Sequence, residues 1–75
     1  MMSKFPAIDG NKVIEALEKI GFQEVRQKGS HVRMRHEDGR VVTIPVHAGK
    51  DIGKGLLNKI LRDAELTRDE FFELL

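Results

Sequence analysis

The residues best suited to chemistry in this sequence lie close together around position 31. His31, Arg33 and Arg35 alternate there with the apolar Val32 and Met34. Successive side chains of a β-strand point to opposite faces, so this pattern predicts a strand that presents the imidazole and both guanidinium groups on one face. Val32 and Met34 are then expected to face the core.

A second basic segment precedes this strand. Arg26 and Lys28 oppose the apolar Val25 along an expected neighbouring strand. Gly29-Ser30 is a turn of the kind that joins antiparallel strands, and we expect it to present His31. The pattern therefore predicts one imidazole among up to four fixed positive charges on a sheet surface.

This combination suits a phosphodiester substrate. Arginine and lysine neutralise backbone phosphates and hold the strand in place. A neutral His31 could take a proton from a ribose 2′-hydroxyl or from water, because imidazole exchanges protons near neutral pH. The neighbouring arginines could stabilise charge that develops on the phosphate oxygens. The alternative interpretation of His31 is a surface histidine beside a glycine turn.

The chemistry envisaged for His31 needs no metal and no other cofactor. The three histidines are spread along the chain, and the carboxylates show no spacing typical of metal ligands. His36 faces the core side by strand parity or sits in a turn, which favours a structural or solvated role. His47, just after Pro45, is a weak second candidate that either orients a loop or reaches the site.

Three lysines, Lys50, Lys54 and Lys59, surround the expected start of a later helix. The first turn of a helix presents free N–H groups to an anion, and Gly53 and Gly55 would let a backbone come close. Readers of double-stranded RNA use similar geometry across a groove, so we expect an outer RNA-contact set here. A flexible loop with solvated lysines is the alternative.

The elements that must position these residues follow from apolar spacing and turn signals. A helix is expected over about 10–20, capped by Asp9 and stopped by Gly21. The expected strands span about 22–28, 31–36 and 40–46. Asp38-Gly39 is a hairpin signal, and Pro45 must lie near a strand end or edge, where its missing N–H is harmless.

Two helices follow the strands. The first carries Leu57, Ile60, Leu61 and Ala64 on one face, and the second opens with a capping box of Thr67 and Glu70, with Leu66 packed on Phe71. The order α-β-β-β-α-α predicts an α+β fold, in which a three-stranded antiparallel sheet has its helices on one face. The other sheet face is left open.

Composition limits what such a chain can be. Its 75 residues suit a single domain over residues 1–75, and without cysteine no disulfide can support it. No apolar run is long enough to cross a bilayer, and the expected N-terminal arm over residues 1–8 lacks an apolar signal core, so we expect a cytoplasmic protein.

The formal net charge of +1 hides a segregation along the chain. Residues 26–35 hold four cations and no acid, whereas residues 64–75 hold one arginine against four acids. An anionic partner is therefore expected for the middle of the chain.

Four segments together carry a resemblance to a known family. They are Gly21-Phe22, Arg26-Gln27-Lys28-Gly29-Ser30-His31, Val42-Thr43-Ile44-Pro45-Val46-His47 and Ile60-Leu61-Arg62-Asp63-Ala64. From about Asp9 to Leu74, the chain resembles the HicA toxins, small mRNA interferases of type II toxin–antitoxin systems.

The resemblance implies a fold like the double-stranded RNA-binding domain and an endoribonuclease that blocks translation by cutting messenger RNA. It implies that His31, in the Gly-Ser-His motif, is catalytic, and that a HicB-type antitoxin binds the toxin and covers this histidine. The chain departs from the common pattern in having Gly55-Leu56-Leu57 for Gly-Thr-Leu and Ala64-Glu65-Leu66 for Ala-Gly-Leu.

Three hypotheses follow for the function. The leading one is a metal-independent endoribonuclease toxin with His31 as general base or acid. A non-catalytic RNA-binding module would use the same cations but would not need the imidazole. An adaptor that binds only proteins would show no RNA binding that weakens with salt.

Overall fold

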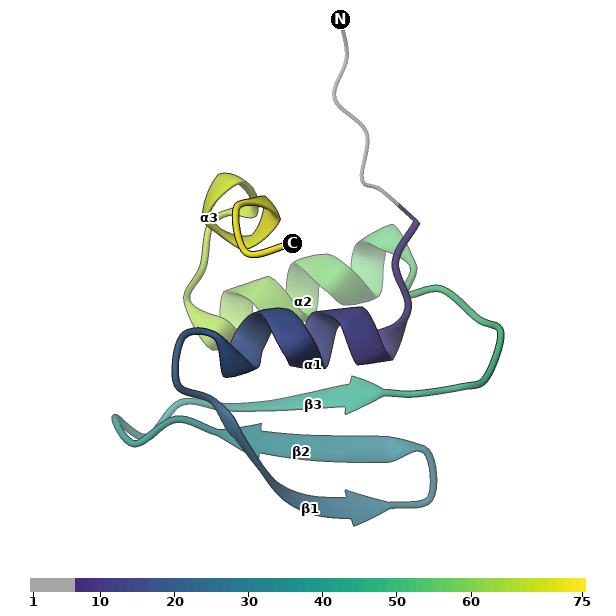
Figure 1. Cartoon of the computed structure of the whole chain (residues 1–75), viewed down its shortest axis with the longest axis horizontal. Helices are drawn as coiled ribbons and strands as arrows, with labels where there is room; N and C mark the ends of the chain where they lie inside the picture. Colours follow the sequence, from purple (N-terminus) through teal and green to yellow (C-terminus); the bar gives the residue numbers. More distant parts are fainter. Residues whose placement is uncertain (1–6) are drawn as a thin grey trace, which may run out of the picture.

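The computed structural model describes residues 7–75, in which three strands form one antiparallel sheet beneath a layer of helices (Figure 1). The elements are α1 (Gly10–Glu18), β1 (Gln23–Lys28), β2 (His31–Arg35), β3 (Val41–Pro45), α2 (Lys54–Ala64) and α3 (Arg68–Phe72). The sheet order is β1-β2-β3, with both pairs antiparallel. The predicted α+β architecture is confirmed, and it is consistent with a fold like the double-stranded RNA-binding domain.

Local signals fix the ends of the elements. The Asp9 carboxylate accepts from the Lys12 N–H at 3.0 Å, and Thr67 and Glu70 form the expected capping box. Helix α1 ends at Glu18 and not near residue 20, because Lys19 and Ile20 bond three residues back in a tightened last turn. Gly21 follows at φ +103°, a conformation that favours glycine.

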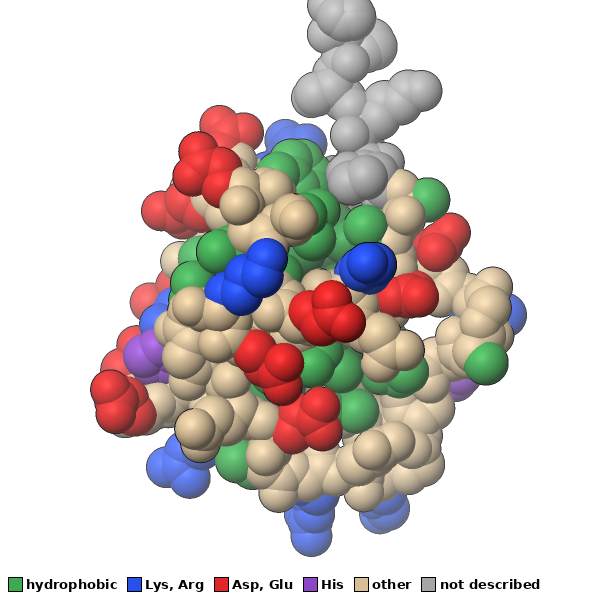
Figure 2. Space-filling model, viewed as in Figure 1, with side chains coloured by type: hydrophobic (Ala, Val, Ile, Leu, Met, Phe, Trp, Pro, Cys, Tyr) green, Lys and Arg blue, Asp and Glu red, His purple; other side chains and the backbone are tan. Residues whose placement is uncertain are grey.

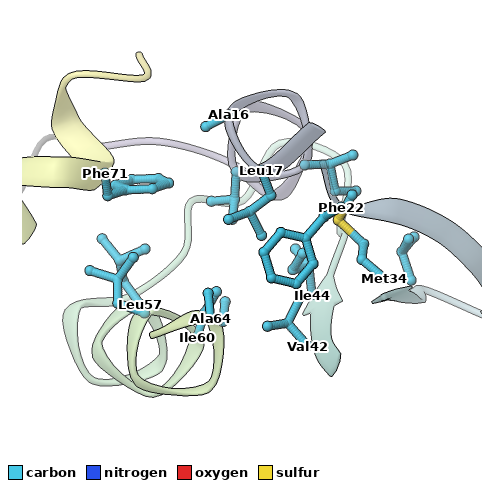
Figure 3. Packing of buried hydrophobic residues seen from close by; sticks show 14 of the residues in the cluster. Ala16, Leu17, Phe22, Met34, Val42, Ile44, Leu57, Ile60, Ala64 and Phe71 are labelled. Atoms are coloured by element: carbon cyan, nitrogen blue, oxygen red, sulfur yellow. The ribbon is translucent and has the colours of Figure 1, made fainter. Parts of the chain in front are cut away.

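The core lies between the sheet and the helices. Val32, Met34, Val42 and Ile44 are buried, which confirms the predicted inward face of β2 and β3. Figure 3 shows the side chains that α1, α2 and α3 bring to the same cluster, which include Leu17, Leu57 and Phe71 respectively. Helix α3 thus packs on the other two helices and not on the sheet (Figure 1).

Strand β1 lies beyond the helical layer, and each of its residues is exposed. Helices α1 and α2 both contact β3, and β1 is held through its pairing with β2. A bulge between Glu24 and Arg26 leaves Val25 out of the regular register and 55% exposed. The sequence predicts Val25 on the face opposite Arg26 and Lys28, but within residues 7–75 its side chain is left uncovered by the helices.

The chain before α1 fastens the loop after β3. The Ile52 N–H donates to the Ile8 carbonyl at 2.7 Å, and Asp9 forms a β-bridge with Asp51. Of the arm expected over residues 1–8, only residues 7 and 8 belong to the described part, and Ile8 is buried. Gly10 lies against the backbone of Pro45 and Val46 with no room for a β-carbon.

The turn between α2 and α3 contains Glu65, where the family pattern commonly has glycine. Glu65 is the C-cap of α2 and adopts the left-handed conformation at φ 59° and ψ 44°. Glycine takes this conformation at little cost, whereas another L-residue pays roughly 1 kcal/mol or more. The turn therefore keeps its geometry at an energetic cost.

Candidate nucleic-acid interface

The open face of the sheet carries the predicted histidine and cations in register. Lys28 of β1 pairs with His31 of β2, and Arg26 pairs with Arg33. On the other side of β2, Pro45 pairs with His31 and Thr43 pairs with Arg33. Paired residues share a face, so these side chains lie opposite the buried Val32 and Met34.

A shallow depression of about 150 Å³ joins several of these side chains. Its lining is formed by Arg26, Lys28, His31, Arg33 and Thr43. His31 also lines two neighbouring hollows, one with His47 and Lys50 and one with Lys59 of α2. The imidazole is exposed and lines all three of these hollows.

His47 lies beside His31, although it is distant in sequence. The ladder continues one step past β3, because the Val46 N–H donates to the Ser30 carbonyl at 2.6 Å. The His31 and His47 ring centroids are 6.5 Å apart, with the ring planes at 83°. Ser30 Oγ lies 3.4 Å from His47 Nε2, a long hydrogen bond. The structure therefore places His47 beside His31 and also in contact with Ser30 of the β1–β2 turn.

The remaining predicted cations are spread around this centre. Arg35 stands at the far end of β2, where it lines a separate hollow with Val25. Lys50 shares a hollow with His31, and Lys59 forms an ion pair of 2.8 Å with Asp63. Lys54 is the first residue of α2 and is exposed, but the hollows around His31 do not include it.

The turn that presents His31 has the geometry that its residues favour. Gly29 adopts φ +58°, and Gln27 donates from its side chain to the Gly29 carbonyl at 3.2 Å. Ser30, the second turn residue, bonds to the loop after β3 through its carbonyl. Gly29-Ser30 therefore fixes both the start of β2 and the neighbouring loop.

His36 lies outside this site. Its Nε2 is 2.9 Å from the Ile20 carbonyl, and its Nδ1 accepts from the Asp38 N–H at 3.1 Å. The ring stands edge-on to Phe22, with centroids 5.2 Å apart. Both ring nitrogens therefore have polar partners, and Nδ1 also lies 3.2 Å from Asp38 Oδ1. His36 therefore holds the turn after β2 against the end of α1, in line with the structural role considered for it.

Sequence reasoning missed several residues around the site. Thr43 and the 39% exposed Leu56 line hollows beside His31. Strand parity relative to the buried Val42 and Ile44 could have placed Thr43 on the open face. Leu56 is the third residue of α2, after the Gly53 N-cap, and the sequence holds no signal that brings it near His31.

Arg40 has a structural role and contacts one residue close to it in sequence and two distant ones. It donates to the Ala64 carbonyl, lies over the Phe22 ring at 5.1 Å and pairs with Asp38 at 2.9 Å. The hydrogen bonds from Arg40 lower the pKa of the Asp38 carboxyl. Arg40 thus ties the β2–β3 turn to the end of α2.

Part of the charge pattern along the sequence is visible on the surface. Figure 2 shows Lys and Arg side chains at the lower edge of the molecule, on the sheet side, and several Asp and Glu side chains over α3 and α1, with Lys or Arg side chains among them. Within residues 7–75, no group of three or more His, Cys, Asp or Glu could hold a metal ion. Over the same residues, no helix is long and apolar enough to cross a membrane.

The fold and this basic face define the class of the protein, a small α+β domain with cationic side chains on the open face of its sheet. Comparison with protein families gives a more specific result. The family described as "HicA toxin of bacterial toxin-antitoxin" matches residues 10–66, which run from α1 to the residue before the α3 cap. The chain therefore belongs to the HicA toxin family, whose members act as toxins in toxin–antitoxin systems and have an antitoxin partner. No curated protein matches the chain.

Proposed function

We propose that this toxin is a metal-independent endoribonuclease that cuts messenger RNA in the cytoplasm and so blocks translation. The single observation that carries the proposal is the exposed His31 imidazole, which shares one depression with Arg26, Lys28 and Arg33 on the open sheet face. A basic surface alone would bind RNA, but an imidazole at its centre adds a group that can move protons.

In this proposal the RNA backbone crosses the open face near the β1–β2 turn. Arg26, Lys28 and Arg33 contact its phosphates, and His31 acts as general base toward the ribose 2′-hydroxyl. As that oxygen attacks, negative charge grows on the phosphate oxygens, and the guanidinium groups stabilise it. Gly29 and Ser30 support this step by holding the turn that presents His31.

Further cations extend the contact to flanking nucleotides. Lys50 and Lys59 line hollows next to His31, while Arg35 and Lys54 lie farther out. Their contribution is long-range attraction and positioning, which weakens as the salt concentration rises. They are therefore proposed as an outer RNA-binding set.

The antitoxin partner is proposed to be of the HicB type and to cover His31. The exposed Leu56 and the half-buried Pro45 lie beside the imidazole in the same hollows. They give a protein partner an apolar contact within an otherwise charged surface. A partner seated there would exclude RNA from the site.

The decisive experiment compares the wild-type protein with His31→Ala in a bacterial host and as purified protein in EDTA. Wild type should arrest growth and produce new RNA ends, whereas His31→Ala should remain folded, bind RNA and cut none. The matched control is Lys12→Ala, which removes a positive charge from α1, on the helical side of the molecule. This variant should cut RNA as the wild type does.

Each alternative function predicts a different outcome of this experiment. RNA binding without cleavage by the wild-type protein would support a non-catalytic RNA-binding module. Cleavage only with added metal would refute the metal-free mechanism, and cleavage by His31→Ala would refute the site. Absence of salt-dependent RNA binding would favour a protein adaptor.

A further inference from the structure

Cleavage by 2′-hydroxyl attack requires two proton transfers, and His31 accounts for one. A base removes the 2′-hydroxyl proton, while an acid protonates the departing 5′-oxygen, since an alkoxide is a poor leaving group. The chain has three histidines. His36 is held by Ile20, Asp38 and Phe22 away from the open face, which leaves His47 as the candidate imidazole for the second transfer.

The geometry around His47 suits that role. Its ring is exposed, lies 6.5 Å from the His31 ring between centroids, and lines a hollow that His31 also lines. In an in-line displacement, the attacking and leaving oxygens stand on opposite sides of the phosphorus. Each needs a proton-transferring group at a hydrogen-bond distance of about 2.8 Å, and imidazole is the side chain most often used. Two rings separated by several ångström can flank one phosphate in this way.

His47 is held in place although it lies in a loop. The preceding residue, Val46, bonds to the Ser30 carbonyl at 2.6 Å, and Ser30 Oγ contacts His47 Nε2 at 3.4 Å. Farther along, the loop is fastened where the Ile52 N–H donates to the Ile8 carbonyl at 2.7 Å. The turn that presents His31 thus also positions His47, and this coupling is a reason to treat the two rings as one unit.

We infer that His47 is the general acid of the cleavage reaction and the partner of His31, an inference that rests on the proposed endoribonuclease function. The 2′-oxygen passes its proton to His31 and forms a bond to phosphorus. The bond from phosphorus to the 5′-oxygen breaks, and that oxygen takes a proton from His47. The products are a 2′,3′-cyclic phosphate and a 5′-hydroxyl, and the two histidines exchange protonation states.

A change of leaving group tests this assignment. After the cut site is mapped, an oligoribonucleotide is made with sulfur in place of the 5′-oxygen at that bond, because a thiolate leaves without protonation. His47→Ala should lose about a hundredfold or more in rate on the oxygen substrate. On the sulfur substrate it should cut nearly as fast as wild type. His31→Ala should fail on both substrates, since the 2′-hydroxyl proton must still be removed.

Matched variants keep the result interpretable. His47→Gln retains a polar group toward Ser30 but cannot donate a proton as imidazolium does, so it should behave as His47→Ala and serves if the alanine variant unfolds. Circular dichroism and thermal unfolding establish folding for each variant, and Lys12→Ala should match wild type on both substrates.

The outcomes separate this inference from the function beneath it. Equal impairment of His47→Ala on both substrates would mean a positioning or structural role and would overturn the assignment, as would undiminished cleavage of the oxygen substrate. In both cases the endoribonuclease proposal stands. A wild-type protein that cuts neither substrate would overturn that proposal and this inference together.

Discussion

The two faces of strand β2 differ although the same five residues form both. On one face Val32 and Met34 are 3% and 0% exposed under the helices, and on the other His31, Arg33 and Arg35 are exposed. Burial of the apolar side chains supplies stability, whereas the cations have no part in the core. Parity along one short strand therefore separates the residues that hold the fold from those proposed to act on RNA.

A second contrast lies between the two edge strands. Strand β3 is packed against α1 and α2, whereas every residue of β1 is exposed. Arg26 and Lys28 can therefore be substituted with little effect on the core, whereas substitution of Val42 or Ile44 of β3 would disturb it. The proposed RNA surface joins these β1 cations to His31 and Arg33, which lie on the open face of the helix-covered strand β2.

The largest effect on stability is expected from shortening a side chain on the buried face of β2. Met34→Ala should lower the free energy of unfolding by about 2–5 kcal/mol, because a fully buried side chain leaves a cavity. Arg33→Ala, its neighbour on the open face, should change stability by less than about 0.5 kcal/mol. Urea unfolding measures both, and equal losses would contradict the division between the two faces.

A smaller loss is expected where α1 meets the end of β3. Gly10→Ala would bring a β-carbon against the backbone of Pro45 and Val46, so the helix or strand must shift. We expect a cost of about 1–3 kcal/mol, as for overpacking elsewhere. The control is Gly55→Ala, since a β-carbon there meets nothing within 4 Å. Thermal unfolding should show a lower midpoint for Gly10→Ala alone.

The open face is tested by the salt dependence of RNA binding. Arg33→Ala should reduce the slope of log affinity against log salt by about one, because it removes one phosphate contact. Lys12→Ala removes the same charge from the side of α1, where Lys12 lines a hollow with Glu15, and should leave the slope unchanged. Filter binding at several salt concentrations gives the slopes. If Arg33→Ala and Lys12→Ala changed the slope equally, the RNA would have to bind elsewhere.

The smallest expected effect is a gain in stability at the turn between α2 and α3, away from both faces of β2. Glu65→Gly should raise stability by about 0.5–1 kcal/mol, because glycine removes the left-handed strain at φ 59° and loses part of that gain to unfolded-chain entropy. Glu73→Gly, at φ −68°, has no strain to relieve and should be destabilising. The difference in denaturation midpoint between the two variants checks the sign.

The sequence by itself determined the features that depend on neighbouring residues. Alternation fixed the two faces of β2, Asp9 and Thr67 fixed helix starts through side-chain caps, and Gly29 allowed the turn before His31. These signals are readable because each acts over a few residues. The order of elements then predicted the α+β architecture.

Only the tertiary structure decided how distant segments meet. It placed the His47 ring 6.5 Å from His31, put Leu56 beside the same histidine and tied Arg40 to the carbonyl of Ala64. It also left Val25 exposed, since the helices stop short of β1. Such contacts depend on the register of the sheet and the reach of the helices, which arise when the whole core packs and have no local pattern in the chain.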